Sequence, residues 1–199
     1  MDNCTLEPTS AFSPIEPSYS SSLAIEPREN LTIASFAAAK GRLQALAGAI
    51  REVYGVELPR RPERVVGHGI AFVWAGPDQW LAIADRALGR DLEQELRPLL
   101  RGLGSVVDQS DGRAVVRVSG SLVRQVLGKG VPVDLHSGSF SVNAVAITHA
   151  SHIGVIIWQL DDVPTFEMAM FRSYADCFMH WLQESIQSTV AAPRGTTDA

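Results

Sequence analysis

The order in which strand-like and helix-like patterns follow one another is the feature that most constrains the fold of this chain. From Leu31 onward, short runs with strand character alternate with runs whose apolar residues recur every three or four positions. The order is strand, helix, two strands, helix, strand, and then strand, helix, three strands, helix. The first block has the wiring of a ferredoxin-like unit, and the second is closely related to it. The sequence therefore predicts an α+β protein made of two ferredoxin-like halves of antiparallel sheet with packed helices.

The strands and helices can be placed from apolar spacing and turn residues. We expect strands at 31–38, 69–74, 79–84, 106–107, 114–118, 143–149, 153–160 and 165–171. We expect helices from Gly41 to Gly55, at 86–103 with a kink or split at Pro98, at 121–128, and from a Ser173 cap to about residue 187. Trp74 and Trp80 flank the predicted hairpin turn at 75–78, where core or cross-strand packing is favoured over a stacking platform.

The two ends of the chain differ in composition from its middle. Residues 1–27 are rich in Ser and Pro, which predicts a disordered leader or an arm that orders on a partner. Its possible anchors are Phe12, Ile15, Tyr19 and Leu23. Residues 28–188 are expected to form a single α+β domain, with possible lobes at 31–110 and 111–188. Residues 189–199 are expected to form a flexible tail.

Composition excludes several classes of partner and location. The formal net charge of −5 argues against nucleic acid. No apolar run reaches the roughly 18 residues that a membrane span needs, and the first 22 residues lack the basic start and apolar core of a secretion signal. Cys4 in the leader and Cys177 in a helix do not suggest a structural disulfide, so a reducing cytoplasm fits. The loop at 58–63 carries Arg60 and Arg61, either as solvated charges or as a surface for an anionic partner.

The central stretch 106–135 is the best candidate for a ligand site. A turn-rich strand pair leads into a short helix through Ser119-Gly120-Ser121, where hydroxyls and free N–H groups can collect. No nucleophile-elbow pattern surrounds Ser119 or Ser121, so a helix cap is favoured over a catalytic serine. Gly128-Lys129-Gly130 lacks the upstream glycine and the following Ser or Thr of a phosphate loop, and it ends a helix instead of starting one.

Other titratable residues form no catalytic or metal pattern. Cys177 and His180 share a helix face, and His149 and His152 flank a predicted hairpin turn, but their spacing matches no zinc signature. The acid pairs Asp108/Asp111 and Asp161/Asp162 lie in turns, where Asp is favoured for local hydrogen bonds. We therefore predict no catalytic, cofactor-binding or metal-binding residue in this chain.

Three segments together resemble the gamma subunit of bacterial heterotetrameric sarcosine oxidase. They are Trp74 to Ala84, the stretch 107–136 with Asp108-x-Ser110-Asp111-x-Arg113 and Lys129-Gly130-x-Pro132-x-Asp134-Leu135-His136, and Asp161-Asp162-x-Pro164-Thr165-Phe166 followed by Arg172-Ser173-Tyr174-Ala175. The similarity spans about residues 31–188. It implies a fold related to the folate-binding domain of the glycine-cleavage aminomethyltransferase.

The resemblance also implies a function. It implies a non-catalytic subunit of a complex with alpha, beta and delta subunits. The complex would oxidise sarcosine (N-methylglycine) to glycine and form hydrogen peroxide, with the methyl carbon passed to tetrahydrofolate or released as formaldehyde. FAD, FMN, NAD and tetrahydrofolate would be held by the partner subunits and none by this chain.

The alternative is a stand-alone folate-binding or one-carbon transfer protein, and a small assembly factor of the same fold is a third. The aminomethyltransferase pattern Gly-Asp-x-x-x-Leu, set against Gly130 to Leu135, places Val131 where that family has its acid, with Asp134 as a possible substitute. An apolar Val cannot hydrogen-bond a folate nitrogen, which argues against retained catalysis.

Overall fold

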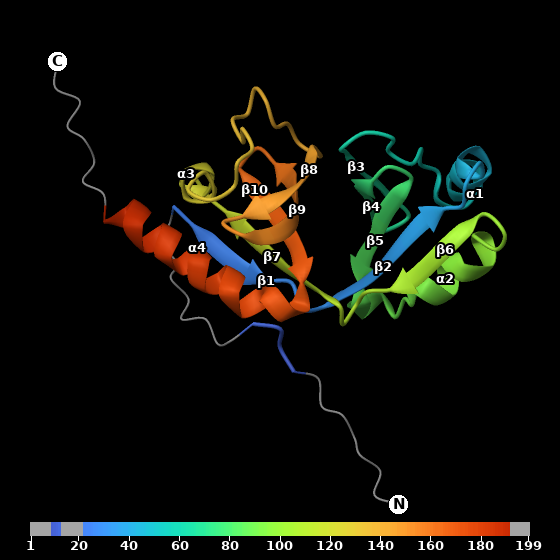
Figure 1. Ribbon diagram of the computed structural model, residues 1–199, viewed down its shortest axis with the longest axis horizontal. Coiled ribbons are helices and arrows are strands. Elements are labelled where there is room, and N and C mark those ends of the chain that lie inside the picture. The colour runs from blue at the N-terminus through green and yellow to red at the C-terminus, as the bar shows by residue number, and fades with distance from the viewer. Residues whose placement is uncertain (1–8, 13–21, 192–199) are drawn as a thin grey trace, which may run out of the picture.

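Two five-stranded antiparallel sheets form the centre of the molecule, and helices cover their outer faces (Figure 1). The computed structural model describes residues 9–12 and 22–191. The first half contains β2 (Leu31–Ala38), α1 (Leu43–Tyr54), β3 (Arg64–Gly67), β4 (Ile70–Gly76), β5 (Gln79–Asp85), the 3-10 turn η1 (Arg86–Leu88), α2 (Leu92–Leu99) and β6 (Gly104–Asp108). The second half contains β7 (Arg113–Ser119), α3 (Val123–Leu127), β8 (Val145–Ala150), β9 (Ile153–Asp161), β10 (Thr165–Phe171), the 3-10 turn η2 (Arg172–Tyr174) and α4 (Ala175–Val190). The sheet of the second half also contains β1 (Ala24–Pro27), which precedes both halves in the sequence.

The strand orders of the two sheets correspond to each other. The first-half sheet runs β3-β4-β5-β2-β6, and the second-half sheet runs β8-β9-β10-β7-β1. Without the edge strands β3 and β8, each sheet has the ferredoxin-like order, in which the first strand of the unit lies between its third and fourth. The predicted pair of ferredoxin-like halves is therefore confirmed. One strand is exchanged, because β1 from the N-terminus occupies the place in the second half that β6 occupies in the first.

Three apolar clusters define four layers. The core between the first sheet and its helices is built on Phe36, Phe72 and Trp80 with the buried faces of α1 and α2. A larger core lies between the second sheet and helices α3 and α4. The inner faces of the two sheets pack on each other through residues such as Ile33, Leu81 and Trp158. The layers therefore run helices, sheet, sheet, helices, as Figure 1 shows from left to right.

Local sequence explains several boundaries. Helix α1 ends at Gly55, whose φ of 69° is in the left-handed region that glycine adopts without strain. The β4–β5 hairpin pairs Trp74 with Trp80, so the predicted cross-strand packing is confirmed. Trp80 is buried and donates its indole N–H to the Pro59 carbonyl at 2.7 Å, which anchors the loop before β3. That loop exposes Arg60 and Arg61, which contact Gln44 and Glu63 respectively.

The predicted long helix at 86–103 is wrong. The segment forms η1 and α2, and it breaks at Gly89, whose φ is 66°, and not at Pro98. Asp91 then caps α2 by accepting a hydrogen bond from the Gln94 N–H at 2.9 Å. The predicted Ser173 cap is also wrong, because Ser173 lies inside η2 and the residue before α4 is Tyr174, with no side-chain cap. Neither Ser119 nor Ser121 caps α3, which begins after Leu122 without a side-chain cap.

The prediction that residues 1–27 have no structure of their own is wrong at their C-terminal end. Ala24–Pro27 form β1, which pairs with β7, and Leu23 and Ile25 are buried in the second-half core. Phe12 is buried in the same core. The proposed anchors Ile15 and Tyr19, like residues 1–8, lie outside the described residues. The described part of the predicted tail is residues 189–191, of which 189 and 190 belong to α4 and Ala191 is its C-cap.

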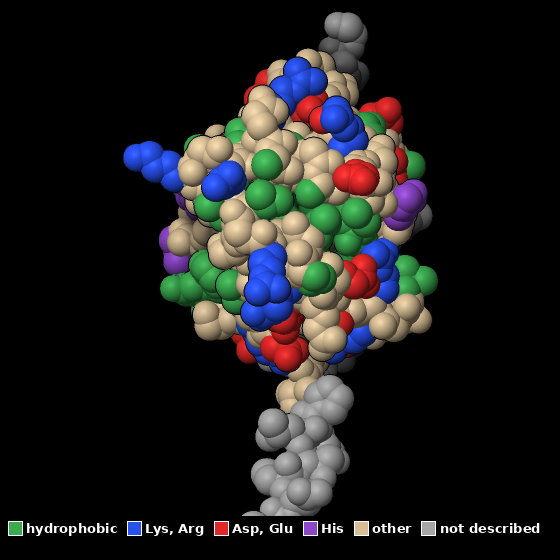
Figure 2. Space-filling model, turned by 90° about the vertical axis from the view of Figure 1, so that its right-hand side faces the viewer, with side chains coloured by type: hydrophobic (Ala, Val, Ile, Leu, Met, Phe, Trp, Pro, Cys, Tyr) green, Lys and Arg blue, Asp and Glu red, His purple; other side chains and the backbone are tan. Residues whose placement is uncertain are grey.

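The surface at the α1 and α2 end mixes acidic, basic and apolar side chains (Figure 2). This face presents no field of a single sign of the kind that a nucleic-acid interface requires. None of the described helices has the length and apolar character needed to cross a bilayer.

Candidate functional site

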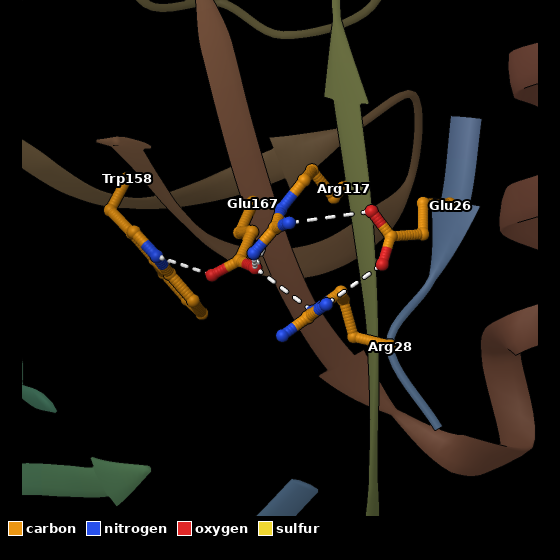
Figure 3. Close-up of polar contacts among 5 residues, drawn as sticks. All are labelled: Glu26, Arg28, Arg117, Trp158 and Glu167. Carbon is orange, nitrogen blue, oxygen red and sulfur yellow. Dashed lines mark hydrogen bonds and ion pairs between the residues drawn. The ribbon is translucent and has the colours of Figure 1, made fainter. Parts of the chain in front are cut away.

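A row of polar side chains crosses the inner face of the second-half sheet. Strand register sets Glu26 beside Arg117, Arg117 beside Glu167, and Glu167 beside Trp158. Because side chains of neighbouring strands in register share one face, the four groups stand in line (Figure 3). They face the other sheet, where most inner residues are apolar.

Glu167 is the centre of this row. Its side chain is 10% exposed. One carboxylate oxygen accepts hydrogen bonds from Arg117 at 2.8 and 3.1 Å and lies 3.4 Å from Nε of Arg28. The other accepts a hydrogen bond from the Trp158 indole N–H at 3.1 Å. Glu26, at the exposed end, pairs with both Arg28 and Arg117 (Figure 3). Such paired charges tolerate burial because each ion faces an opposite one.

Arg64 brings the first-half sheet to the same cluster. It lies on β3, donates from Nη1 to the Asn143 side-chain oxygen at 2.9 Å, and its backbone N–H donates to the Asn143 carbonyl at 2.9 Å. Burial lowers the pKa of Arg64 below its usual value, while Glu167 raises it and Arg117 lowers it. The charges of Glu167 and Arg117 therefore act on the Arg64 guanidinium across the sheet interface. These contacts tie β3 of the first half to the segment before β8 of the second half.

A recess of about 760 Å³ opens where the chain passes between the two sheets. Its walls come from the β1–β2 and β6–β7 connections, from η1 and η2, and from residues 9–12. Four arginines line it, and only two carboxylates do so. They are Arg28, Arg86, Arg113 and Arg172, with Glu29 and Asp111. The recess is therefore lined by more basic than acidic side chains.

The residues considered for zinc do not come together. Cys177 is an exposed free thiol, and His149, His152 and His180 are exposed. His180 pairs with Glu184 one helical turn away. Within residues 9–12 and 22–191, no group of three or more His, Cys, Asp or Glu side chains is arranged to hold a metal ion.

Two of the four turn acids, Asp108 and Asp161, make the predicted local hydrogen bonds. Asp108 accepts hydrogen bonds from the N–H and hydroxyl of Ser110 at 3.0 and 2.6 Å. Asp161 accepts from the Val163 N–H at 2.9 Å. Both are local hydrogen bonds of the kind that favours Asp in turns.

The glycine–lysine segment after α3 has a packing role. Lys129 donates to the Ser188 hydroxyl at 2.9 Å. A Cβ on Gly130 would lie 2.7 Å from the Trp181 ring, so only glycine lets the indole approach the backbone here. Ser151 also donates its N–H to the Gly130 carbonyl at 2.8 Å.

Val131 and Asp134 were the positions compared with the folate-contacting acid. Val131 is buried in the second-half core. Asp134 is exposed and accepts a hydrogen bond from the His136 N–H at 3.0 Å. Hydrogen bonds from the Ser139 side chain and the His136 backbone lower the pKa of Asp134. Its carboxylate is thus held within its own loop.

Sequence reasoning missed Arg28, Arg117 and Glu167, which carry the charged row. The only signal was an ionisable residue at an alternate position of two otherwise apolar strands. Partner identity depends on register between segments 50 and 91 residues apart, as for Arg117 with Glu167 and with Glu26. Periodicity within one strand does not contain that information.

Both the sequence and the fold of this chain are similar to those of known proteins. A family model described as sarcosine oxidase, gamma subunit family matches residues 38–188. The sarcosine oxidase subunit gamma of Corynebacterium sp. (strain P-1) is 33% identical over 148 residues, covering 73% of this chain and 71% of the relative. A chain of the heterotetrameric sarcosine oxidase from Corynebacterium sp. U-96, solved in complex with pyrrole 2-carboxylate, superposes with a TM-score of 0.72 at 28% identity, covering 88% of this chain and 90% of that one.

The second solved structure shows the fold alone. Glycine cleavage system aminomethyltransferase T from Bartonella henselae superposes with a TM-score of 0.61 at 11% identity, over 81% of this chain and 45% of that one. The expected relation to the aminomethyltransferase fold is confirmed. Together with the family match over residues 38–188, these findings show that the chain belongs to the sarcosine oxidase gamma subunit family.

Proposed function

We propose that this chain is a non-catalytic structural subunit of a heterotetrameric complex that oxidatively demethylates sarcosine to glycine. The carrying observation is the superposition on a chain of heterotetrameric sarcosine oxidase, which extends over 88% of this chain and 90% of the other. An agreement over nearly the whole of both chains supports the same place in an assembly, and not only a shared domain.

The chemistry of the interior supports a structural role. The buried charges between the sheets are committed to one another, since Glu167 is shared by Arg28, Arg117 and Trp158. Val131 stands where a folate-contacting acid would be needed, and Asp134 is held by its own loop. A general acid or base needs a free carboxyl within reach of a substrate, and these residues do not provide one.

Exposed apolar side chains support a role in assembly. Leu88 is 60% exposed, Phe171 is 52% exposed and Tyr174 is 48% exposed. They belong to η1, to the end of β10 and to η2, which lie beside the arginine-lined recess. Large apolar groups at one end of a molecule are a common mark of a protein interface.

The assembly that we infer has alpha, beta and delta subunits as partners and lies in the cytoplasm. FAD, FMN, NAD and tetrahydrofolate would be bound by those partners. The methyl carbon of sarcosine would pass to tetrahydrofolate or leave as formaldehyde, with hydrogen peroxide formed. This chain would contribute surface and rigidity.

Co-expression tests the proposal directly. The chain is tagged, expressed with the genes that neighbour its own, and purified by the tag. A yellow eluate that oxidises sarcosine and contains one copy of this chain per large subunit is the expected result. A colourless, lone 21.5 kDa species would contradict the proposal. Heat on titrating that species with a reduced folate would then favour a stand-alone folate-binding protein.

A paired variant localises the interface. The double variant Leu88→Ser, Tyr174→Ser should lower the yield of assembled complex while the chain itself remains folded, because both side chains are already exposed. Val190→Ser is the control, since Val190 is 61% exposed at the opposite end of α4 from Tyr174. Equal recovery of all partners with both variants would show that this end of the molecule is not the interface.

A further inference from the structure

The arginine-lined recess contains a cation that no described residue neutralises. The Arg113 side chain makes no hydrogen bond or ion pair with another described residue, and its Nε is buried without a partner. Its guanidinium lies over the Phe171 ring, 4.2 Å from the ring centre, which offers attraction but no negative charge. Burial lowers the pKa of Arg113 below its usual value. A desolvated cation of this kind is unfavourable unless an anion joins it.

Two neighbouring arginines of the recess also lack a close negative counter-charge among the described residues. Arg172 donates to the Thr9 carbonyl, a neutral acceptor. Arg86 approaches Asp111 only to 3.9 Å, and both side chains are at least half exposed. Arg28 is the exception, because Glu26 and Glu167 already neutralise it. Among the residues that the structure describes, these three guanidinium groups of the recess thus have no carboxylate within 3.5 Å, in a chain whose formal net charge is −5.

The two-fold repeat of the fold explains why the arginines meet. Arg86 is the first residue of η1 after β5, and Arg172 is the first residue of η2 after β10. Strands β5 and β10 occupy equivalent places in the two sheets. Arg113 begins β7, the strand that pairs with β10, and its register partner is Phe171. The repeat therefore places one arginine from each half, Arg86 and Arg172, in the lining of a single recess.

We propose that this recess is a binding site for a carboxylate-bearing anion, held by Arg113 and Arg172 with Arg86 at its rim. A planar guanidinium matches the two oxygens of a carboxylate. The volume of about 760 Å³ is in the range of small-molecule sites. The carboxylate belongs either to a free organic acid or to an acidic side chain of a subunit that docks on this end.

Calorimetry on the full chain tests the first source. Citrate is the probe at neutral pH and low salt, with glycerol as an uncharged comparison. Citrate is expected to bind, and Arg113→Gln is expected to weaken its binding about tenfold or more, because a charged hydrogen-bond partner is lost. Arg113→Lys keeps the charge without the planar fork, so it should retain part of the affinity. Arg101→Gln, an exposed arginine outside the recess, should leave binding unchanged.

Subunit assembly tests the second source. If citrate does not bind at millimolar concentration, the carboxylate should come from a partner, and Arg113→Gln should then lower the recovery of partner subunits while Arg101→Gln does not. Arg172→Gln is the second variant in both arms. It keeps the test valid if Arg113→Gln does not unfold cooperatively and is therefore misfolded. This arm rests on the proposed function, whereas the citrate arm does not.

The outcomes separate clearly. Loss of citrate binding, or selective loss of assembly, in both recess variants supports the site. Citrate binding that is equal in the wild type and both recess variants places the anion elsewhere and overturns the proposal. No citrate binding together with unchanged assembly also overturns it. A wild-type chain that assembles with no partner contradicts the proposed function. In that case the citrate titration alone tests whether the recess binds a carboxylate.

Discussion

At the scale of single residues, Glu167 has more consequences than any other charged side chain between the sheets. Its carboxylate is the shared counter-ion of Arg117 and Arg28, it accepts the Trp158 indole N–H, and it influences Arg64 from the opposite sheet. A buried carboxylate with several cationic partners is hard to replace, because its loss leaves several buried charges without compensation.

Glu167→Gln is therefore expected to destabilise the protein by about 3 kcal/mol, the lower part of the range for breaking buried pairs, since Arg117 and Arg28 still reach solvent. Glu26→Gln is the matched control. Its side chain is 52% exposed, so the expected loss is below about 1 kcal/mol. Urea unfolding of the two variants measures the difference. Equal midpoints would show that the row contributes no more than a surface pair.

Asp134 provides a test that depends on pH. The Ser139 side chain and the His136 N–H hold its folded-state pKa below the value of about 3.9 that an unfolded chain has. Because the folded pKa is the lower one, the contribution of these hydrogen bonds is complete above that unfolded value. It is lost as the pH falls through the folded value. In an NMR titration, the Asp134 carboxyl should have its midpoint below the reference, and Ser139→Ala should move the midpoint upward. A midpoint at or above the reference contradicts the loop geometry.

At the scale of elements, the turn after β7 controls how β1 docks. Gly120 has a φ of 115°, and a Cβ placed on it would lie 2.4 Å from the carbonyl oxygen of Ser22, next to the buried Leu23. The same carbonyl accepts a hydrogen bond from the Leu122 N–H at 3.2 Å. The close approach of these two backbones is possible only without a side chain.

Gly120→Ala should thus destabilise the protein by at least about 1–3 kcal/mol, through backbone strain and displacement of the segment before β1. Gly48→Ala is a matched control that should change the free energy of unfolding in the opposite direction. Gly48 lies inside α1 with nothing within 4 Å of an added Cβ, so alanine should stabilise by about 0.5–1 kcal/mol. Thermal unfolding followed by circular dichroism compares them. A Gly120→Ala variant as stable as the wild type would mean that β1 does not dock as described.

At the scale of the whole molecule, the N-terminal strand is a part of the second half. Removing residues 1–27 would take away β1 together with Leu23 and Ile25, which are 2% and 6% exposed. Burial of each such side chain contributes about 1.5–3 kcal/mol, and small domains are stable by only about 5–15 kcal/mol. The shortened chain should melt at a much lower temperature and expose the edge of β7. Removing residues 1–8 alone keeps β1, Leu23 and Ile25 in place and is the control. Similar melting of both shortened chains would contradict the assignment of β1 to this core.

The sequence predicted the layered architecture because most strands have a face pattern of their own. The β9 and β10 runs are apolar over nearly their whole length, and the β4–β5 hairpin is marked by its turn residues. β1 and β3 were missed because each has four residues and lies at an edge, where the neighbouring strand stabilises it more than its own composition does. The recess was missed for a related reason. Arg86, Arg113 and Arg172 are far apart in sequence, and only the pairing of equivalent strands brings them together.

The exchanged strand also has a consequence for how the chain is made. During vectorial synthesis β1 leaves the ribosome first, but its partner β7 follows only after the whole first half. Domains generally fold as units in the order of their synthesis. We therefore expect the first half to fold while Leu23 and Ile25 are still exposed to solvent. The second half then closes over a segment from the far end of the chain, a long-range pairing of high contact order that slows folding. The first of the described strands to be made must therefore wait for the second half before it can pair.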